Sequence, residues 1–294
     1  MRIVSYFYQG ATRGGILHED SVFDLEELLI AAGRHATSSV REFLATSGDG
    51  LDELSMGIAA LIAQRPEAFV GALDTMSLTT PITDPGKVLC IGLNYKDHVA
   101  ETGRALPEHP DVFVKFASTL IGPDAEIQGA DITDNLDFEG EVAVVIGRRA
   151  HRVSEHDALQ HVAGLAPLND ITARDLQYRG TQWTAGKAVD SSTPWGPAIV
   201  TLDEVGDPQT LELSTRVNGV ELQRSNTRHQ IFTIARIVSY LSSFLALEPG
   251  DVIATGTPQG IGAKRIPPIW LQPGDTVEVH VDRLGLLSNE VARV

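Results

Sequence analysis

Three carboxylates lead into an apolar strand in the stretch NLDFEGEVAVVIG, residues 135–147. Asp137, Glu139 and Glu141 are each two residues apart, and the apolar run Val142–Ile146 follows them directly. Residues two apart in a strand point to the same side, so Glu139 and Glu141 face together. Like charges this close repel and raise one another's pKa values unless a cation neutralises them. The pattern also fits the polar face of an edge strand, although the apolar continuation favours a central strand.

A fourth acid, Asp170, ends a second apolar stretch, HVAGLAPLND, in the same way. Carboxylates that converge from two strand ends form a site with oxygen ligands only. Such a site favours a hard cation, Mg²⁺, Mn²⁺ or Ca²⁺, over zinc. The sequence contains no DxDxDG loop of the EF-hand type.

Several common nucleotide and hydrolase motifs are excluded. The segment GTQWTAGKA has five residues between Gly180 and Gly186, and Ala188 stands where a P-loop carries the hydroxyl ligand for magnesium. No GxGxxG follows a strand, and no GxSxG elbow occurs. The acids therefore remain the strongest indication of chemistry.

The elements that position these acids are mostly strands. Residues 1–30 read as short strands, helical patterns cover 40–45 and 51–64, and the Pro-rich segment 79–87 reads as a linker. Beyond it, Asn94 is predicted to cap a short helix ending at Gly103, and Asn218-Gly219 predicts a β-hairpin. Regular βαβ alternation is absent. We therefore predict a mainly β architecture with flanking helices (α+β), divided into residues 1–80 and 81–294.

Composition narrows the class of protein. The 294 residues carry a net charge of −16, which argues against nucleic acid or an acidic membrane surface as a partner. No apolar run approaches the ~20 residues that span a bilayer, and the first residues lack a signal-peptide core, so we expect a cytoplasmic protein. The single cysteine, Cys90, cannot form an internal disulfide.

Six segments together resemble the fumarylacetoacetate hydrolase family: IGLNYKDHVAETG, DFEGEVAVVIG, NDITARDLQ, QWTAGKAVDSSTPWGPAIV, VNGVELQ and PGDVIATGTPQGIG. Their order and spacing agree with the family over roughly residues 85–294, nearer to its short bacterial members. The resemblance implies a mixed β-sandwich roll behind a small N-terminal domain, and commonly a homodimer. It also implies Mg²⁺ or Mn²⁺, with Ca²⁺ as a structural substitute, and a small anionic 2-oxo or 1,3-dicarbonyl acid as substrate.

Carried over position by position, the resemblance assigns roles to individual side chains. The metal ligands fall on Glu139, Glu141 and Asp170, whereas Asp137 matches a residue that is not a ligand. The catalytic group comprises Lys187 with His98 and Glu101, which are three apart on a helix and hence on one face. Substrate contacts fall on Arg174, Gln182, Lys115 and Thr257. The family usually has proline after this lysine, but this chain has Phe116.

The leading hypothesis is a metal-dependent hydrolase that cleaves a C–C bond in acylpyruvate-like 1,3-diketo acids, as in the catabolism of aromatic compounds. In this reading the metal polarises the carbonyl groups, and Glu101 orients His98, which activates water. Lys187 stabilises the departing carbanion. The alternative is decarboxylation of oxaloacetate or keto–enol isomerisation at the same site, which needs no attacking water. A non-enzymatic binding protein is the third reading, and the complete set of acids with His98 argues against it.

Overall fold

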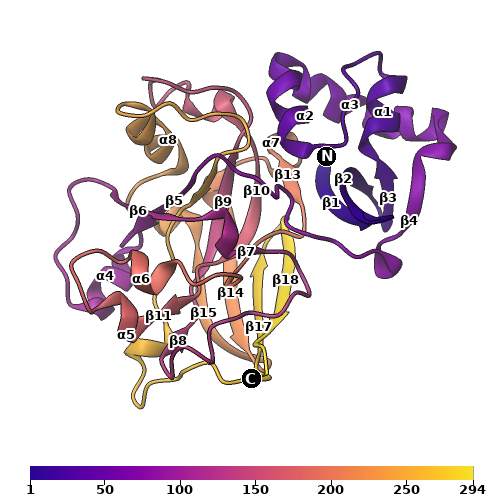
Figure 1. Cartoon of the computed structure of the whole chain (residues 1–294). Helices are drawn as coiled ribbons and strands as arrows, with labels where there is room; N and C mark the ends of the chain where they lie inside the picture. The colour runs from indigo at the N-terminus through magenta and orange to yellow at the C-terminus, as the bar shows by residue number, and fades with distance from the viewer. Residues whose placement is uncertain (294) are drawn as a thin grey trace.

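The computed structural model describes residues 1–293 and shows a sheet-rich body with a smaller N-terminal part beside it (Figure 1). A ten-stranded mixed sheet runs through both parts in the order β4-β3-β2-β1-β13-β10-β9-β16-β5-β6. Its strands are β1 (Arg2–Tyr8), β2 (Ala11–His18), β3 (Ser21–Asp24), β4 (Phe69–Ala72), β5 (Val88–Gly92), β6 (Asp111–Lys115), β9 (Gly140–Ile146), β10 (Val162–Asn169), β13 (Ile199–Thr201) and β16 (Val252–Ala254).

A second sheet of four strands has the order β15-β14-β17-β18. It consists of β14 (Glu212–Val217), β15 (Val220–Asn226), β17 (Thr276–Val281) and β18 (Gly285–Glu290). The predicted hairpin is confirmed, because Asn218 and Gly219 both have positive φ angles, 51° and 77°, between β14 and β15. Short pairs join β7 (Leu120–Ile121) to β12 (Thr193–Pro194) and β8 (Leu136–Asp137) to β11 (Thr172–Ala173).

The two large sheets pack face to face as a β-sandwich. Apolar side chains of β9 and β10 contact those of β14, β17 and β18 in one buried cluster, and α8 (Ile234–Ser242) closes it. Alternate residues of β9 supply the other face: Ala143 and Val145 join the cluster under the N-terminal helices α1 (Leu25–Ala31), α2 (Val40–Ser47) and α3 (Leu51–Gln64). The predicted mainly β fold with flanking helices is therefore confirmed.

The strand after the acids is a central one. β9 pairs with β10 on one side and β16 on the other, and all seven of its residues are buried. The exposed-edge explanation of the acids is therefore wrong. The N-terminal strands join the same sheet, since β1 pairs antiparallel with β13. The division at residue 80 stays a prediction, because the sheet continues across it.

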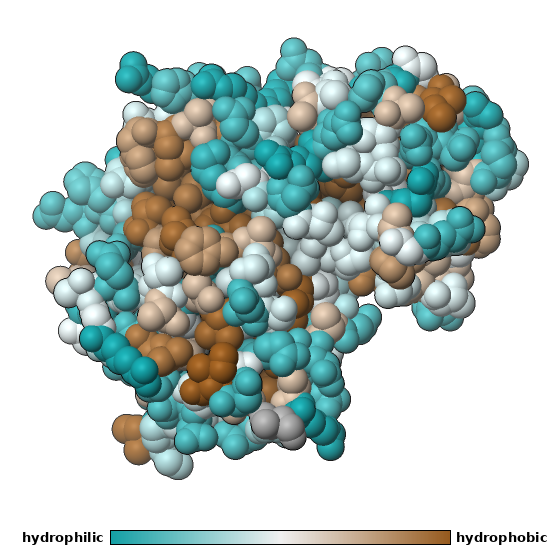
Figure 2. Space-filling view, viewed as in Figure 1, coloured by the Kyte–Doolittle hydropathy of each residue, from teal (hydrophilic) through white to brown (hydrophobic). Residues whose placement is uncertain are grey.

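The opposite edge of the ten-stranded sheet is β6. Figure 2 shows hydrophobic residues gathered on this face of the molecule, over β6 and α8, where Val114, Phe116 and Phe244 are exposed. The remaining short helices are α4 (Lys96–Thr102), α5 (Arg174–Gln177), α6 (Thr184–Lys187) and α7 (Leu202–Val205). The first three lie together beside the end of β9 that carries the acids (Figure 1). No helix among residues 1–293 is long and apolar enough to span a membrane.

Candidate metal centre and active site

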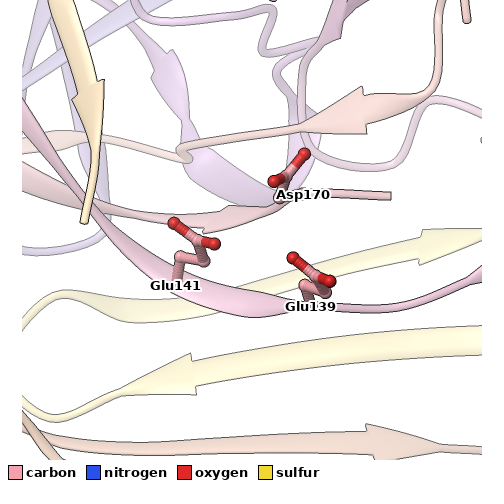
Figure 3. Close-up of side chains that lie close together, drawn as sticks. All are labelled: Glu139, Glu141 and Asp170. Atoms are coloured by element: carbon pink, nitrogen blue, oxygen red, sulfur yellow. The ribbon is translucent and has the colours of Figure 1, made fainter. Parts of the chain in front are cut away.

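Adjacent strands bring the three predicted metal ligands together. Glu139 and Glu141 flank the first residue of β9, and Asp170 directly follows β10, which pairs with β9 through Asn169 and Gly140. The Asp170 N–H donates to the Glu139 carbonyl oxygen at 2.8 Å. One carboxylate oxygen from each residue lies within 4.8 Å of the others, and all three side chains are buried (Figure 3). This cluster of oxygen donors is able to hold a metal ion.

Gly140 allows β9 to lie close to the second sheet. A Cβ atom at this position would overlap the Thr215 hydroxyl of β14. The Gly140 N–H donates to Gln223 Oε1 at 3.0 Å, and its carbonyl oxygen accepts from Thr257 Oγ1 at 3.0 Å. These contacts fix the backbone between the two glutamates. Thr257 thus helps to fix the Gly140 backbone between the two glutamates, and it also lines the adjoining cavity.

Two lysines neutralise part of the cluster. Lys187 Nζ lies 2.7 Å from Glu139 Oε2 and 2.6 Å from Asp170 Oδ2. Lys115 Nζ donates to the other carboxylate oxygen of Asp170, Oδ1, at 2.7 Å. Burial alone would lower the pKa of Lys187, but the carboxylates of Asp170 and Glu139 outweigh it and raise that pKa. Lys187 therefore stays charged, as electrostatic stabilisation of an anion requires.

Glu141 has no such partner. Among residues 1–293 it forms no ion pair, and its Oε2 accepts from the Gly256 N–H at 2.7 Å. Burial, followed by the charges of Asp170 and Glu139, raises its pKa well above the ordinary value. Burial would also raise the pKa of Glu139, but Lys187 and Arg174 outweigh it and lower that pKa to about 2. A divalent cation beside Glu141 would supply the missing positive charge, so the residues present fit a hard metal ion.

Asp137 is directed away from this cluster. Its Oδ1 accepts from the Gly262 N–H at 2.8 Å, and its Oδ2 accepts from Arg174 Nε at 2.8 Å. Arg174 also donates from Nη2 to Glu139 Oε1 at 2.6 Å and from Nη1 to Gln177 Oε1 at 3.1 Å. Asp137 thereby holds Arg174, and Arg174 holds Glu139 in place.

His98 and Glu101 lie on one face of α4, as their spacing predicts. His98 Nδ1 is 2.7 Å from Glu101 Oε1, and Glu101 Oε2 accepts from the Gly260 N–H at 2.9 Å. The prediction that Asn94 caps this helix is wrong, because Tyr95 precedes the first turn and makes no side-chain cap. Asn94 instead donates from Nδ2 to the Thr255 carbonyl oxygen at 2.8 Å and accepts from the Phe232 N–H at 2.8 Å.

A cavity of about 180 Å³ adjoins the carboxylate cluster and α4. His98, Glu139, Glu141, Arg174, Lys187 and Thr257 all line it. Gln182 is exposed and does not line the cavity, and Lys115 lies behind Asp170. The sequence reasoning missed several lining residues: Arg104, Phe113, Gln177, Tyr178, Trp183 and Lys264. The sequence could have indicated Gln177, because it lies three residues after Arg174 and therefore on the same face of a helix.

Residues 87–292 match the C-terminal domain of fumarylacetoacetate (FAA) hydrolase. The chain belongs to the fumarylacetoacetate hydrolase family. It is 41% identical to the human mitochondrial oxaloacetate tautomerase FAHD2A over 240 residues, which is 81% of this chain and 76% of the relative. The fumarylacetoacetate hydrolase of Exiguobacterium antarcticum superimposes with a TM-score of 0.83 at 33% identity and covers 100% of both chains.

A maleylpyruvate hydrolase from Sphingobium sp. SYK-6, solved with manganese(II) and pyruvate, has a TM-score of 0.77 at 26% identity and covers 99% of both chains. The matches establish an enzyme family that includes isomerases and hydrolases. The predicted cytoplasmic location and homodimer stay predictions, and several relatives carry mitochondrial names.

Proposed function

We propose that this chain is a divalent-metal-dependent keto–enol isomerase of small 2-oxo acids, with oxaloacetate as its candidate substrate. The observation that carries the proposal is that His98, which is held by Glu101, lines the same small cavity as Glu139 and Glu141 of the carboxylate cluster. The volume of about 180 Å³ lies below the ~300–1,000 Å³ typical of pockets for drug-sized ligands, which favours a substrate with few carbon atoms. The 41% identity to an oxaloacetate tautomerase supports the same class of reaction.

Isomerisation of a 2-oxo acid needs a base at C3 and stabilisation of the charge that develops on the 2-oxo oxygen. A Mg²⁺ or Mn²⁺ ion held by Glu139, Glu141 and Asp170 would supply Lewis-acid polarisation of that oxygen. His98 moves the proton: Glu101 holds Nδ1, which leaves Nε2 for the substrate. Lys187 keeps a positive charge beside the developing anion, and the burial of these groups strengthens their interaction.

Hydrolysis of an acylpyruvate-like diketo acid is the second candidate. The similarity in fold to a maleylpyruvate hydrolase favours it, as does a histidine able to activate water. A third reaction, decarboxylation of oxaloacetate, would use the same polarised 2-oxo group. Parallel assays of the Mg²⁺-loaded protein distinguish these reactions. Enol absorbance of oxaloacetate, release of pyruvate and cleavage of acetylpyruvate are each followed. The proposal expects the first rate to exceed the other two, and cleavage of acetylpyruvate as the fastest reaction would establish the hydrolase instead.

A further inference from the structure

Two cations line the active-site cavity without holding a carboxylate. Arg104 lies just beyond the end of α4, and Lys264 ends the short helix Gly262–Lys264. Both side chains are exposed, and neither forms an ion pair within residues 1–293. The other cations of the lining, Arg174 and Lys187, hold the buried acids. Arg104 and Lys264 are therefore available to a ligand.

Aromatic side chains position Arg104. Its guanidinium carbon lies 5.2 Å from the ring centroid of Trp183. That ring packs edge-to-face on Phe113, with centroids 5.4 Å apart, and it covers Gly92, where a Cβ atom would meet it. Stacking on an aromatic face orients a guanidinium while its N–H donors stay free. The contact with Trp183 thus places the Arg104 cation at the wall of the cavity.

A braced loop positions Lys264. The N–H groups of Gly262 and Ala263 donate to Asp137 at 2.8 and 3.1 Å. The Gly260 N–H donates to Glu101 of α4, the helix that Arg104 follows. The bond between Glu101 and Gly260 therefore ties together the two segments that carry the cations. Both segments contribute to the lining of one cavity.

The charges of the inner site explain what these cations would bind. Four buried carboxylates stand against three buried cations: Asp137, Glu139, Glu141 and Asp170 against Lys115, Arg174 and Lys187. A divalent ion would leave one formal positive charge, which the carboxylate next to a 2-oxo group neutralises. A second carboxylate on the substrate would find no further cation there, and the net charge of −16 would repel it.

We propose that Arg104 and Lys264 together bind a second, distal carboxylate and thereby select dicarboxylic 2-oxo acids over monocarboxylic ones. The inference rests on the proposed function, because it places the 2-oxo acid end of the substrate at the carboxylate cluster. The distal carboxylate then points towards the exposed part of the cavity, where it contacts the side chains of Arg104 and Lys264. Charge-assisted hydrogen bonds from both sides fix the orientation of the substrate.

Calorimetric titration of the Mn²⁺-loaded protein tests the inference with two unreactive ligands. Malate has the carbon skeleton of oxaloacetate, and 2-hydroxybutyrate has a methyl group in place of the distal carboxylate. The parent should bind malate at least about 10-fold more tightly. Arg104→Gln and Lys264→Met should each weaken malate binding about 10-fold and leave 2-hydroxybutyrate unchanged. The affinity for Mn²⁺ should stay the same, which shows that the inner site is intact.

Matched controls remove the same charges elsewhere. Arg228 and Lys96 are exposed, line no part of this cavity and form no ion pair among the described residues, so Arg228→Gln and Lys96→Met should leave both affinities unchanged. Equal affinity of the parent for the two ligands, including no measurable binding of either, would overturn the inference. So would variants that weaken both ligands alike. A parent that shows this selectivity but does not isomerise oxaloacetate would contradict only the proposed function.

Discussion

Glu101 connects His98 to Gly260, a residue far along the chain. One carboxylate oxygen lies 2.7 Å from His98 Nδ1, and the other accepts the Gly260 N–H at 2.9 Å. The imidazole is therefore held in one orientation by a side chain that is itself anchored to another segment. This arrangement fixes which ring nitrogen faces the cavity, and a general base requires that.

Removing the imidazole should abolish most of the activity. We expect His98→Ala to lower kcat by about 10²–10⁴-fold, the usual contribution of a positioned general base. Glu101→Gln should lower kcat less, because the amide oxygen can still accept one of the two hydrogen bonds. Steady-state rates on oxaloacetate with saturating Mg²⁺ provide the measurement.

The control for this pair is Glu108→Gln, which removes a charge from an exposed position beyond α4. The kcat of Glu108→Gln should equal that of the parent. The melting temperatures of all three variants should stay close to the melting temperature of the parent. An unchanged kcat in His98→Ala would show that another group moves the proton.

Two predicted metal ligands should differ in their effect on the metal-free protein. Asp170 holds both Lys115 and Lys187, so Asp170→Asn leaves two buried ammonium groups with too little negative charge. We expect a loss of about 3–5 kcal/mol in the free energy of unfolding. Glu141 has no cation partner and a raised pKa, so Glu141→Gln should change this free energy by less than about 1 kcal/mol.

Denaturant unfolding in EDTA and in millimolar Mg²⁺ measures both effects. The parent should gain stability from Mg²⁺ by mass action, and both variants should gain much less. Equal gains in the parent and in Asp170→Asn would mean that the metal binds elsewhere. Equal losses in the two variants without metal would contradict the unequal charge compensation seen in the structure.

Metal binding should release a proton. Because its pKa is raised, Glu141 retains its proton in the metal-free protein above the ~4.3 at which a free glutamate ionises. Between that pH and the raised pKa of Glu141, the folded protein binds more protons than the unfolded chain. The stability of the metal-free protein therefore falls as pH rises through this range. A metal needs the ionised carboxylate, so its affinity should rise with pH by up to about tenfold per unit.

Calorimetric titration of the parent with Mn²⁺, in two buffers of different ionisation enthalpy, counts the released protons. We expect close to one proton per ion at pH values below the raised pKa of Glu141. Heats that are identical in the two buffers would show that Glu141 is already ionised before the metal binds.

The sequence was sufficient for the carboxylate cluster and for the central strand beside it. The two-residue spacing of Glu139 and Glu141 and the apolar run after them are local signals that survive folding. The ion pairs of the lysines were harder to predict. Repulsion among the acids follows from their spacing, but the contact between Lys115 and Asp170 depends on how β6 and β10 lie in the sheet. Asn94 resembles a helix cap locally, yet contacts with Thr255 and Phe232 determine its conformation.

Arg104 and Lys264 were beyond the reach of sequence reasoning for a related reason. They are 160 residues apart in number, neither lies in a recognised motif, and only the folded chain brings both to one cavity. Gln182 illustrates the converse. It precedes Trp183 in a matching motif, but the chain turns so that the tryptophan lines the cavity and the glutamine is exposed.

The most direct test of the central claim follows the enol absorbance of freshly dissolved oxaloacetate after addition of the Mg²⁺-loaded parent, its EDTA-treated form and His98→Ala. The proposed keto–enol isomerase should bring the tautomers to equilibrium much faster than Mg²⁺ alone, without matching release of pyruvate. Both the EDTA-treated protein and His98→Ala should approach the background rate. A parent rate equal to that of free Mg²⁺, or full activity in demonstrably metal-free protein, would contradict the account.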